Sequence, residues 1–148
     1  MDVQVTTNKI AELAQSMCNM PEELHYDLPV KHNFSKGVYV REIFMPKGAL
    51  VVGKIHKTRH LNIVSRGHCI VVTPLRKLTI DATKFPQTFE SGEGEQKVVL
   101  MLEDTVWSTV HVTEETDVDV IVDQELTTTE YDQELIAKLA QQARECLS

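Results

Sequence analysis

The sequence has no uninterrupted run of about 18 apolar residues, the length that a membrane-spanning helix needs. Its first residues also lack the basic and then apolar pattern of a signal peptide. Only three cysteines are present, far apart and without a C-x-x-C pair, which excludes a disulfide framework and a cysteine-based zinc knuckle. We therefore expect a cytoplasmic protein with reduced thiols, in which Cys18 and Cys146 lie on apolar helix faces and belong to the core.

Positive charge is scarce in the second part of the chain. Residues 86–148 carry 3 Lys and Arg against 15 Asp and Glu, whereas residues 1–85 carry 12 against 7. The net charge of −7 argues against nucleic acid and anionic membranes as partners, while the basic first part can still contain a local anion site. With 148 residues, 42% of them hydrophobic, we expect a single domain over residues 1–148.

The two ends of the chain have helical periodicity. Apolar residues recur at helical spacing over residues 7–20, and Pro21 ends this pattern. A capping-box pattern at residues 127–130 predicts a C-terminal amphipathic helix over residues 129–147. These helices either close a β core or exchange between the protomers of a dimer.

Between the helices, short β-branched runs alternate with turn residues such as those at 46–48 and 65–67. The runs predict strands over residues 38–45, 49–56, 68–73, 78–80, 98–102, 106–113 and 118–122. Many strands at close spacing, with no long helix between them, indicate an antiparallel sandwich or small barrel over residues 38–122. The expected fold class is mainly β, with short terminal helices.

Three of the six histidines stand where chemistry is plausible: His56, His60 and His111. Alternation along a strand places Lys54, His56 and His60 on one face. In the later strand Trp107, Thr109 and His111 also share a face, and the apolar Trp107 indicates that this face points inward. Neutral imidazoles that converge inside a barrel form a good site for a first-row transition metal.

A cation next to such a site favours an anionic ligand. Lys54 and Arg41 belong to the basic segment, and we expect both to bind the ligand together with Trp107 and Thr109. Beside a bound metal ion the pKa of Lys54 would fall, which would allow it to act as a catalytic base.

Other interpretations of these residues stay open. His56 and His60 also fit a solvent-facing strand, and His111 fits a core histidine with satisfied hydrogen bonds. The spacing of His56 and His60 occurs in helical zinc proteases as well, but Lys57 stands where a protease has its glutamate, and the β-branched neighbours favour a strand.

The spacing of Gly48, Lys54, His56, His60 and Gly67 resembles the first signature of the cupin superfamily, in which a glycine, two histidines, a glutamate and a glycine follow one another. Lys54 stands at the first histidine and His60 at the glutamate. The resemblance implies a cupin barrel, a jelly roll, across residues 38–122.

His111 resembles the histidine of the second cupin signature, with Glu115 in place of its asparagine. The resemblance thus implies that His56, His60 and His111 are the metal positions. Residues 32–48, 53–60 and 103–111 also resemble small cupin proteins encoded by tailed bacteriophages, which implies a source, with the host cytoplasm as location, and no particular reaction.

We therefore expect a phage-type cupin whose three histidines hold a divalent transition metal (zinc, iron, nickel or manganese) and which binds or transforms a small anionic ligand. Two alternatives are a metal-free module that sequesters an anionic metabolite or nucleotide signal, and a virion or assembly component. Because pairing would protect exposed sheet edges, we expect a homodimer.

Overall fold

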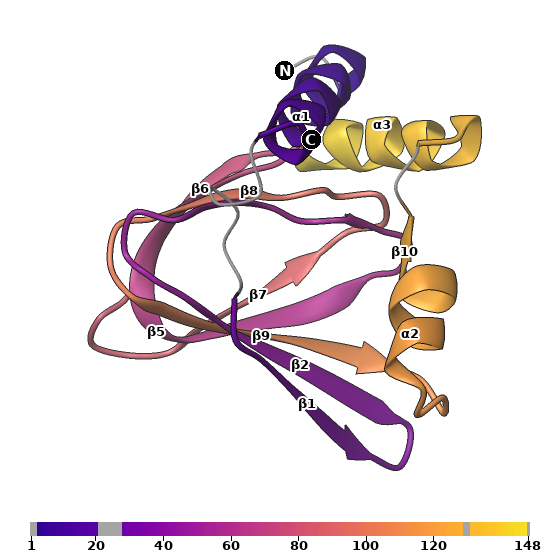
Figure 1. Ribbon diagram of the computed structural model, residues 1–148. Helices are drawn as coiled ribbons and strands as arrows, with labels where there is room; N and C mark the ends of the chain where they lie inside the picture. The colour runs from indigo at the N-terminus through magenta and orange to yellow at the C-terminus, as the bar shows by residue number, and fades with distance from the viewer. Residues whose placement is uncertain (1–2, 21–27, 129–130, 148) are drawn as a thin grey trace.

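The computed structural model describes residues 3–20, 28–128 and 131–147 and has a curled antiparallel sheet flanked by helices (Figure 1). The helical elements are α1 (Val3–Cys18), α2 (Val118–Val120), the π-helical turn η2 (Ile121–Leu126) and α3 (Gln133–Leu147). The strands are β1 (Val30–Ser35), β2 (Val38–Met45), β3 (Leu50–Val52), β4 (Ile55–His56), β5 (His60–Val72), β6 (Lys77–Ala82), β7 (Gln87–Ser91), β8 (Val98–Met101), β9 (Thr105–Val112) and β10 (Thr127–Thr128).

The main sheet has the strand order β1-β2-β9-β5-β8-β3, with β6 and β7 also paired to β5, and all of its pairs are antiparallel. The fold class predicted from the sequence, mainly β and antiparallel with a helix at each end, is confirmed. The sheet curls into a half-barrel rather than closing completely (Figure 1).

Strand β5 connects the two layers of the half-barrel. Residues 60–64 pair with β7 and β9, whereas residues 67–72 pair with β6 and β8. The prediction of a turn at 65–67 is wrong, because the strand only bends there, with a register shift between Val64 and Arg66. Gly67 permits this bend: its φ is +125°, and a Cβ atom would lie 2.7 Å from the Thr105 Cα.

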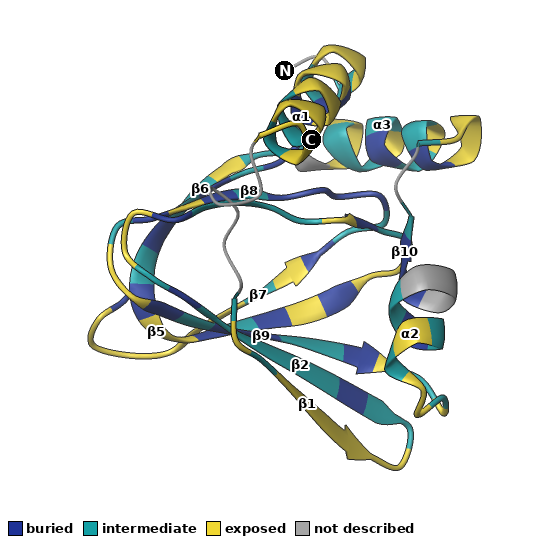
Figure 2. Ribbon diagram, in the orientation of Figure 1, coloured by how far each residue is buried: buried dark blue, intermediate teal, exposed yellow. Residues whose placement is uncertain are grey.

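The core fills the space between the two layers. Alternate residues of β5, β8 and β9 point inward, as the dark blue segments of Figure 2 show. This core includes Val64, Cys69, Val71, Met101 and Trp107. The inward position of Trp107 is the one that the sequence predicts.

Helices α1 and α3 lie above the layer of β6 and β8, where α1 contacts α3 and β3, and α2 lies apart from them beside the end of β9 (Figure 1). Leu135 and Leu139 of α3 are buried. The prediction that Cys18 belongs to the core is wrong, since it is exposed at the end of α1, and the side chain of Cys146 lies outside the described residues. None of the helices in the described ranges combines the length and apolar character needed to cross a bilayer.

Two predicted strands have different structures, and two observed strands were not predicted. Residues 49–56 form two short strands, β3 and β4, with a break at residues 53–54, and β1 and β7 fall where no strand was predicted. Residues 118–122 are helical, although valine and isoleucine favour strands. The carboxylate of Asp117 caps this helix by accepting hydrogen bonds from the backbone N–H groups of Asp119 (3.0 Å) and Val120 (3.4 Å).

Candidate metal and anion site

The three histidines predicted from the sequence converge at the open end of the half-barrel. His56 is the last residue of β4, His60 the first residue of β5, and His111 lies near the end of β9. Their ring centroids are 4.3 Å apart for His56 and His60, 4.8 Å for His60 and His111, and 5.7 Å for His56 and His111. One ring nitrogen from each residue lies within 4.8 Å of the other two, an arrangement that can hold a metal ion.

The route by which His56 and His60 meet differs from the predicted one. Alternation along one continuous strand would place them on a common face, but residues 57–59 form a bend between β4 and β5. The two imidazoles therefore meet across that bend. Strand β4 is held in place by antiparallel pairing with β10, in which Thr127 lies opposite His56.

The hydrogen bonds of the cluster leave ring nitrogens available. The Nδ1 of His60 lies 3.2 Å from the Thr58 carbonyl oxygen, which accepts its proton and so leaves the lone pair on Nε2. The Nδ1 atoms of His56 and His111 are buried and have no hydrogen-bond partner in the described part of the chain. Buried nitrogens of this kind are costly unless something binds them, so the residues present fit a metal ion.

Burial keeps these imidazoles neutral. It lowers the pKa of His56 well below the ordinary value, that of His60 to about 3 and that of His111 to about 4. The positive charge of Lys97 lowers all three further. At neutral pH the histidines are thus in the form that ligates metals.

Lys97 is the residue of this site that the sequence reasoning missed. It directly precedes β8, is only 7% exposed, and places its Nζ 3.4 Å from the Nε2 of His60. Burial lowers the pKa of Lys97 to about 8. One signal was present in the sequence: it is one of only three cations in residues 86–148 and stands next to an apolar strand.

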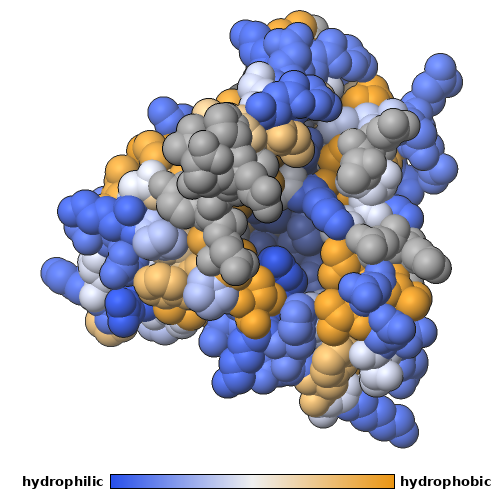
Figure 3. All heavy atoms as spheres, viewed as in Figure 1, coloured by the Kyte–Doolittle hydropathy of each residue, from blue (hydrophilic) through white to orange (hydrophobic). Residues whose placement is uncertain are grey.

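Two cavities adjoin the histidines, and they share Arg41, Lys54, His56 and Thr109 as lining residues. The main cavity measures about 380 Å³, also reaches His111, and is otherwise lined mostly by apolar side chains. The smaller cavity, of about 90 Å³, reaches Lys97 and Trp107. No described carboxylate lines either of them. In the space-filling view the molecule has a central hollow, with hydrophilic residues in it and hydrophobic residues along part of its edge (Figure 3).

The predicted ligand-binding residues all lie at these cavities, in different environments. Arg41 is half-buried on β2, opposite Thr109 of β9. Trp107 is buried, and its indole N–H donates to Asn62 Oδ1 (3.1 Å), so it is part of the core as well as of the cavity wall. Lys54 is exposed and stands at the rim.

No protein-family model matches this sequence, and no curated protein matches it. Solved structures do match. A DMSP lyase from Ruegeria pomeroyi has a TM-score of 0.53 at 8% identity, over 67% of this chain and 54% of its own. Salicylate 1,2-dioxygenase from Pseudoaminobacter salicylatoxidans has a TM-score of 0.51 at 9% identity, over 72% of this chain and 31% of its own. A cupin superfamily protein from Desulfitobacterium hafniense has a TM-score of 0.48 at 8% identity, over 62% of this chain and 83% of its own.

The curled antiparallel half-barrel is cupin-like. At these identities the comparisons establish the fold alone, so the chemistry of this protein depends on its own residues. His56, His60 and His111, whose spacing resembles the cupin signatures, converge as that resemblance implies. Lys54, at the position of the first signature histidine, brings an exposed cation to the rim instead of another imidazole.

Proposed function

We propose that this cupin holds a divalent transition metal through His56, His60 and His111 and binds a small organic anion beside it. The observation that carries the proposal is the convergence of three neutral imidazoles at a cavity that no described carboxylate lines. Three nitrogen ligands suit zinc, iron(II) or nickel better than calcium or magnesium.

A metal bound there supplies a Lewis acid for an oxygen of the ligand. The rest of the recognition comes from the chain itself. Arg41 faces the cavity with no hydrogen-bond or ion-pair partner among the described residues, so its guanidinium is available to an anion. Apolar side chains, among them Val30, Ile43 and Leu126, line the main cavity and suit a short hydrocarbon body. Lys54 meets the ligand at the rim, where it holds or deprotonates it.

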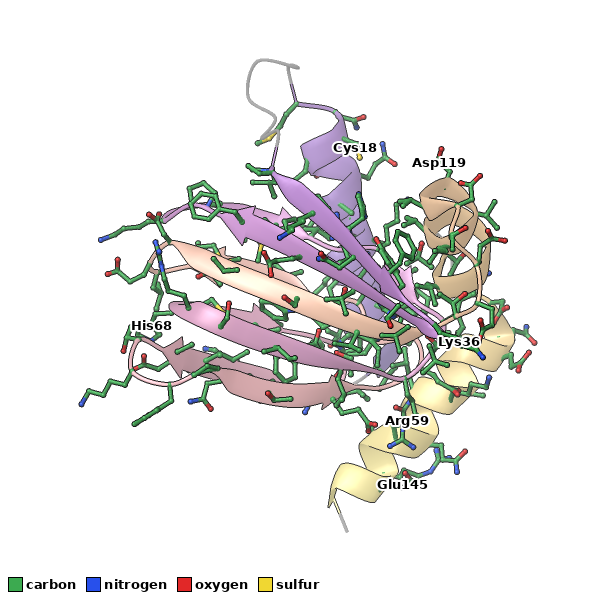
Figure 4. All side chains as sticks on the ribbon, turned by 90° about the horizontal axis from the view of Figure 1, so that it is seen from below. Cys18, Lys36, Arg59, His68, Asp119 and Glu145 are labelled. Atoms are coloured by element: carbon green, nitrogen blue, oxygen red, sulfur yellow. The ribbon has the colours of Figure 1, made fainter. Side chains whose placement is uncertain are left out.

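Metal analysis of protein purified without a histidine tag tests this function. We expect about one divalent metal ion per chain in the wild type and little in His56→Ala or His111→Ala, because each variant removes one of three ligands. His68→Ala is the matched control: His68 belongs to the same strand as His60 but lies at the other end of the sheet from Arg59, the residue before His60 (Figure 4). Equal metal content in all four proteins would refute the site.

The position of Lys97 favours a second candidate function, a metal-free module that binds the anion. Its ammonium already contacts the ring nitrogen of His60. This function predicts that metal-free protein retains a small anion in native mass spectrometry and loses it in Lys54→Ala or Arg41→Ala. The setting that we propose for either function, infection by a tailed bacteriophage, comes from the sequence resemblance alone.

A further inference from the structure

The positive charges beside the histidine cluster are not balanced. Arg41 and Lys97 line the smaller cavity together with His56, and Lys97 also contacts His60. Neither cation forms an ion pair with a described residue, and the described lining of both cavities lacks Asp and Glu. A buried cation without a counter-ion is unusual, because its desolvation is uncompensated.

The carboxylate that acts on Lys97 is that of Glu95, and its oxygens are already engaged. The Oε1 of Glu95 accepts from Arg76 Nη2 (3.0 Å), and its Oε2 accepts from Arg76 Nε (3.2 Å) and Thr73 Oγ1 (3.0 Å). Glu95 therefore neutralises Arg76 first. The charge of Lys97 is directed instead toward the histidines.

A divalent ion at the histidines would meet two obstacles. It would lie close to two cations in a partly desolvated site, where charges interact strongly. It would also need the lone pair of His60 Nε2, the atom to which Lys97 Nζ lies at 3.4 Å. An anion placed between the metal and Lys97 removes both obstacles, since it offers the ammonium another partner and offsets the added charge.

We propose that the metal and a small carboxylate bind this site as a pair, with the carboxylate held by Lys97 and Arg41 in the smaller cavity. The inference rests on the proposed function, because it takes His56, His60 and His111 as the metal ligands. It identifies the ligand as an organic acid whose charged end enters the smaller cavity and whose short apolar body occupies the main one. Without the acid, Lys97 competes with the metal for His60.

The test is the zinc affinity of tag-free protein at one fixed pH, measured by competition with a chelator in the presence and absence of acetate or benzoate. For the wild type we expect the carboxylate to tighten zinc binding at least about fivefold, and zinc to tighten carboxylate binding by the same factor, as linkage requires. Lys97→Met should bind zinc more tightly than the wild type when no carboxylate is present, and should lose the coupling.

Lys84→Met is the control, because Lys84 is an exposed lysine in the turn between β6 and β7 and lines neither cavity. It should keep the wild-type coupling. If Lys97→Met does not fold, Arg41→Met carries the same test, with reduced coupling as the expected result.

The outcomes separate this inference from the function on which it rests. Zinc binding by the wild type that neither carboxylate changes, or coupling that survives in Lys97→Met, would overturn the pairing and leave the metal site intact. A wild type that binds no zinc with or without carboxylate would overturn both.

Discussion

Asn62 is a fully buried polar side chain that ties the candidate site to the core. Its Oδ1 accepts from Trp107 Nε1 (3.1 Å), and its Nδ2 donates to Ser91 Oγ (2.8 Å) and to the Phe89 carbonyl (3.3 Å). It thus links β5, β7 and β9, the strands around His60 and His111. All of its polar atoms are satisfied, as burial requires.

Replacing Asn62 by alanine should therefore destabilise the fold. Asn62→Ala leaves the indole N–H of Trp107 buried without an acceptor, which costs about 1–3 kcal/mol of the free energy of unfolding. Urea denaturation measures the loss as a lower midpoint. Asn33→Ala, at an exposed position on β1, should stay close to the wild type. Equal midpoints for the two variants would show that the buried network contributes nothing.

At the scale of single residues, the sequence predicted a site residue correctly where both its spacing and the character of its neighbours pointed to the same position. His111 could be placed inside because the apolar Trp107 shares its face, and His56 and His60 because they match a known signature spacing. Lys97 could not be found in this way. Its burial depends on the packing of the segment before β8, which no local pattern encodes, and an isolated lysine is ordinarily exposed.

The segment that carries Lys97 is held by the ion pair of Arg76 and Glu95. Glu95 is completely buried, whereas the side chain of Arg76 is 33% exposed. Arg76 also donates to the Glu90 carbonyl and lies over the ring of Phe89. The pair thereby connects the turn between β5 and β6 to β7 and to residues 92–97.

This difference in burial predicts unequal effects of the two single substitutions. Arg76→Met leaves a buried carboxylate without its counter-ion and should cost about 3–5 kcal/mol of the free energy of unfolding. Glu95→Gln should cost less, because water can reach the partly exposed guanidinium.

The double variant Arg76→Met with Glu95→Leu is the control for this pair. It removes both charges of the pair and so leaves no carboxylate buried without Arg76, and its urea midpoint should lie closer to that of the wild type than the midpoint of Arg76→Met does. A double variant less stable than Arg76→Met would contradict the explanation by charge burial.

At the scale of elements, strands that contain a continuous β-branched run were predicted well. Elements whose form depends on tertiary contacts were not. The predicted strand at 38–45 matches β2, and that at 106–113 corresponds to β9. Only residues 68–73 of β5 were predicted, because Gly67 indicates a turn, whereas the structure uses it to bend one strand through both layers. Residues 118–122 have strand-like side chains, but the cap at Asp117 and the burial of Ile121 make them helical.

The whole molecule should lose stability as the pH falls below 6.5, and the histidine cluster should account for a measurable part of the loss. In metal-free folded protein, burial lowers the pKa of His60 to about 3 and of His111 to about 4, against an ordinary value of 6.5 in the unfolded chain. Between these values the unfolded chain binds more protons than the folded chain. The free energy of unfolding must therefore decrease as the pH falls from 6.5 toward 4.

Urea midpoints of chelator-treated protein at pH 7.5 and pH 4.5 measure this loss, and a variant separates it from the titration of carboxylates. In His60→Gln with His111→Gln the acidic residues are unchanged while two of the buried imidazoles are gone, so the midpoint should fall less between the two pH values than in the wild type. A bound metal should steepen the wild-type decrease further, because protons then compete with the ion for the same nitrogens. If the metal-free wild type and the double variant lose the same stability, the histidines are not held neutral in the folded protein, and the basis for a three-imidazole metal site disappears with that result.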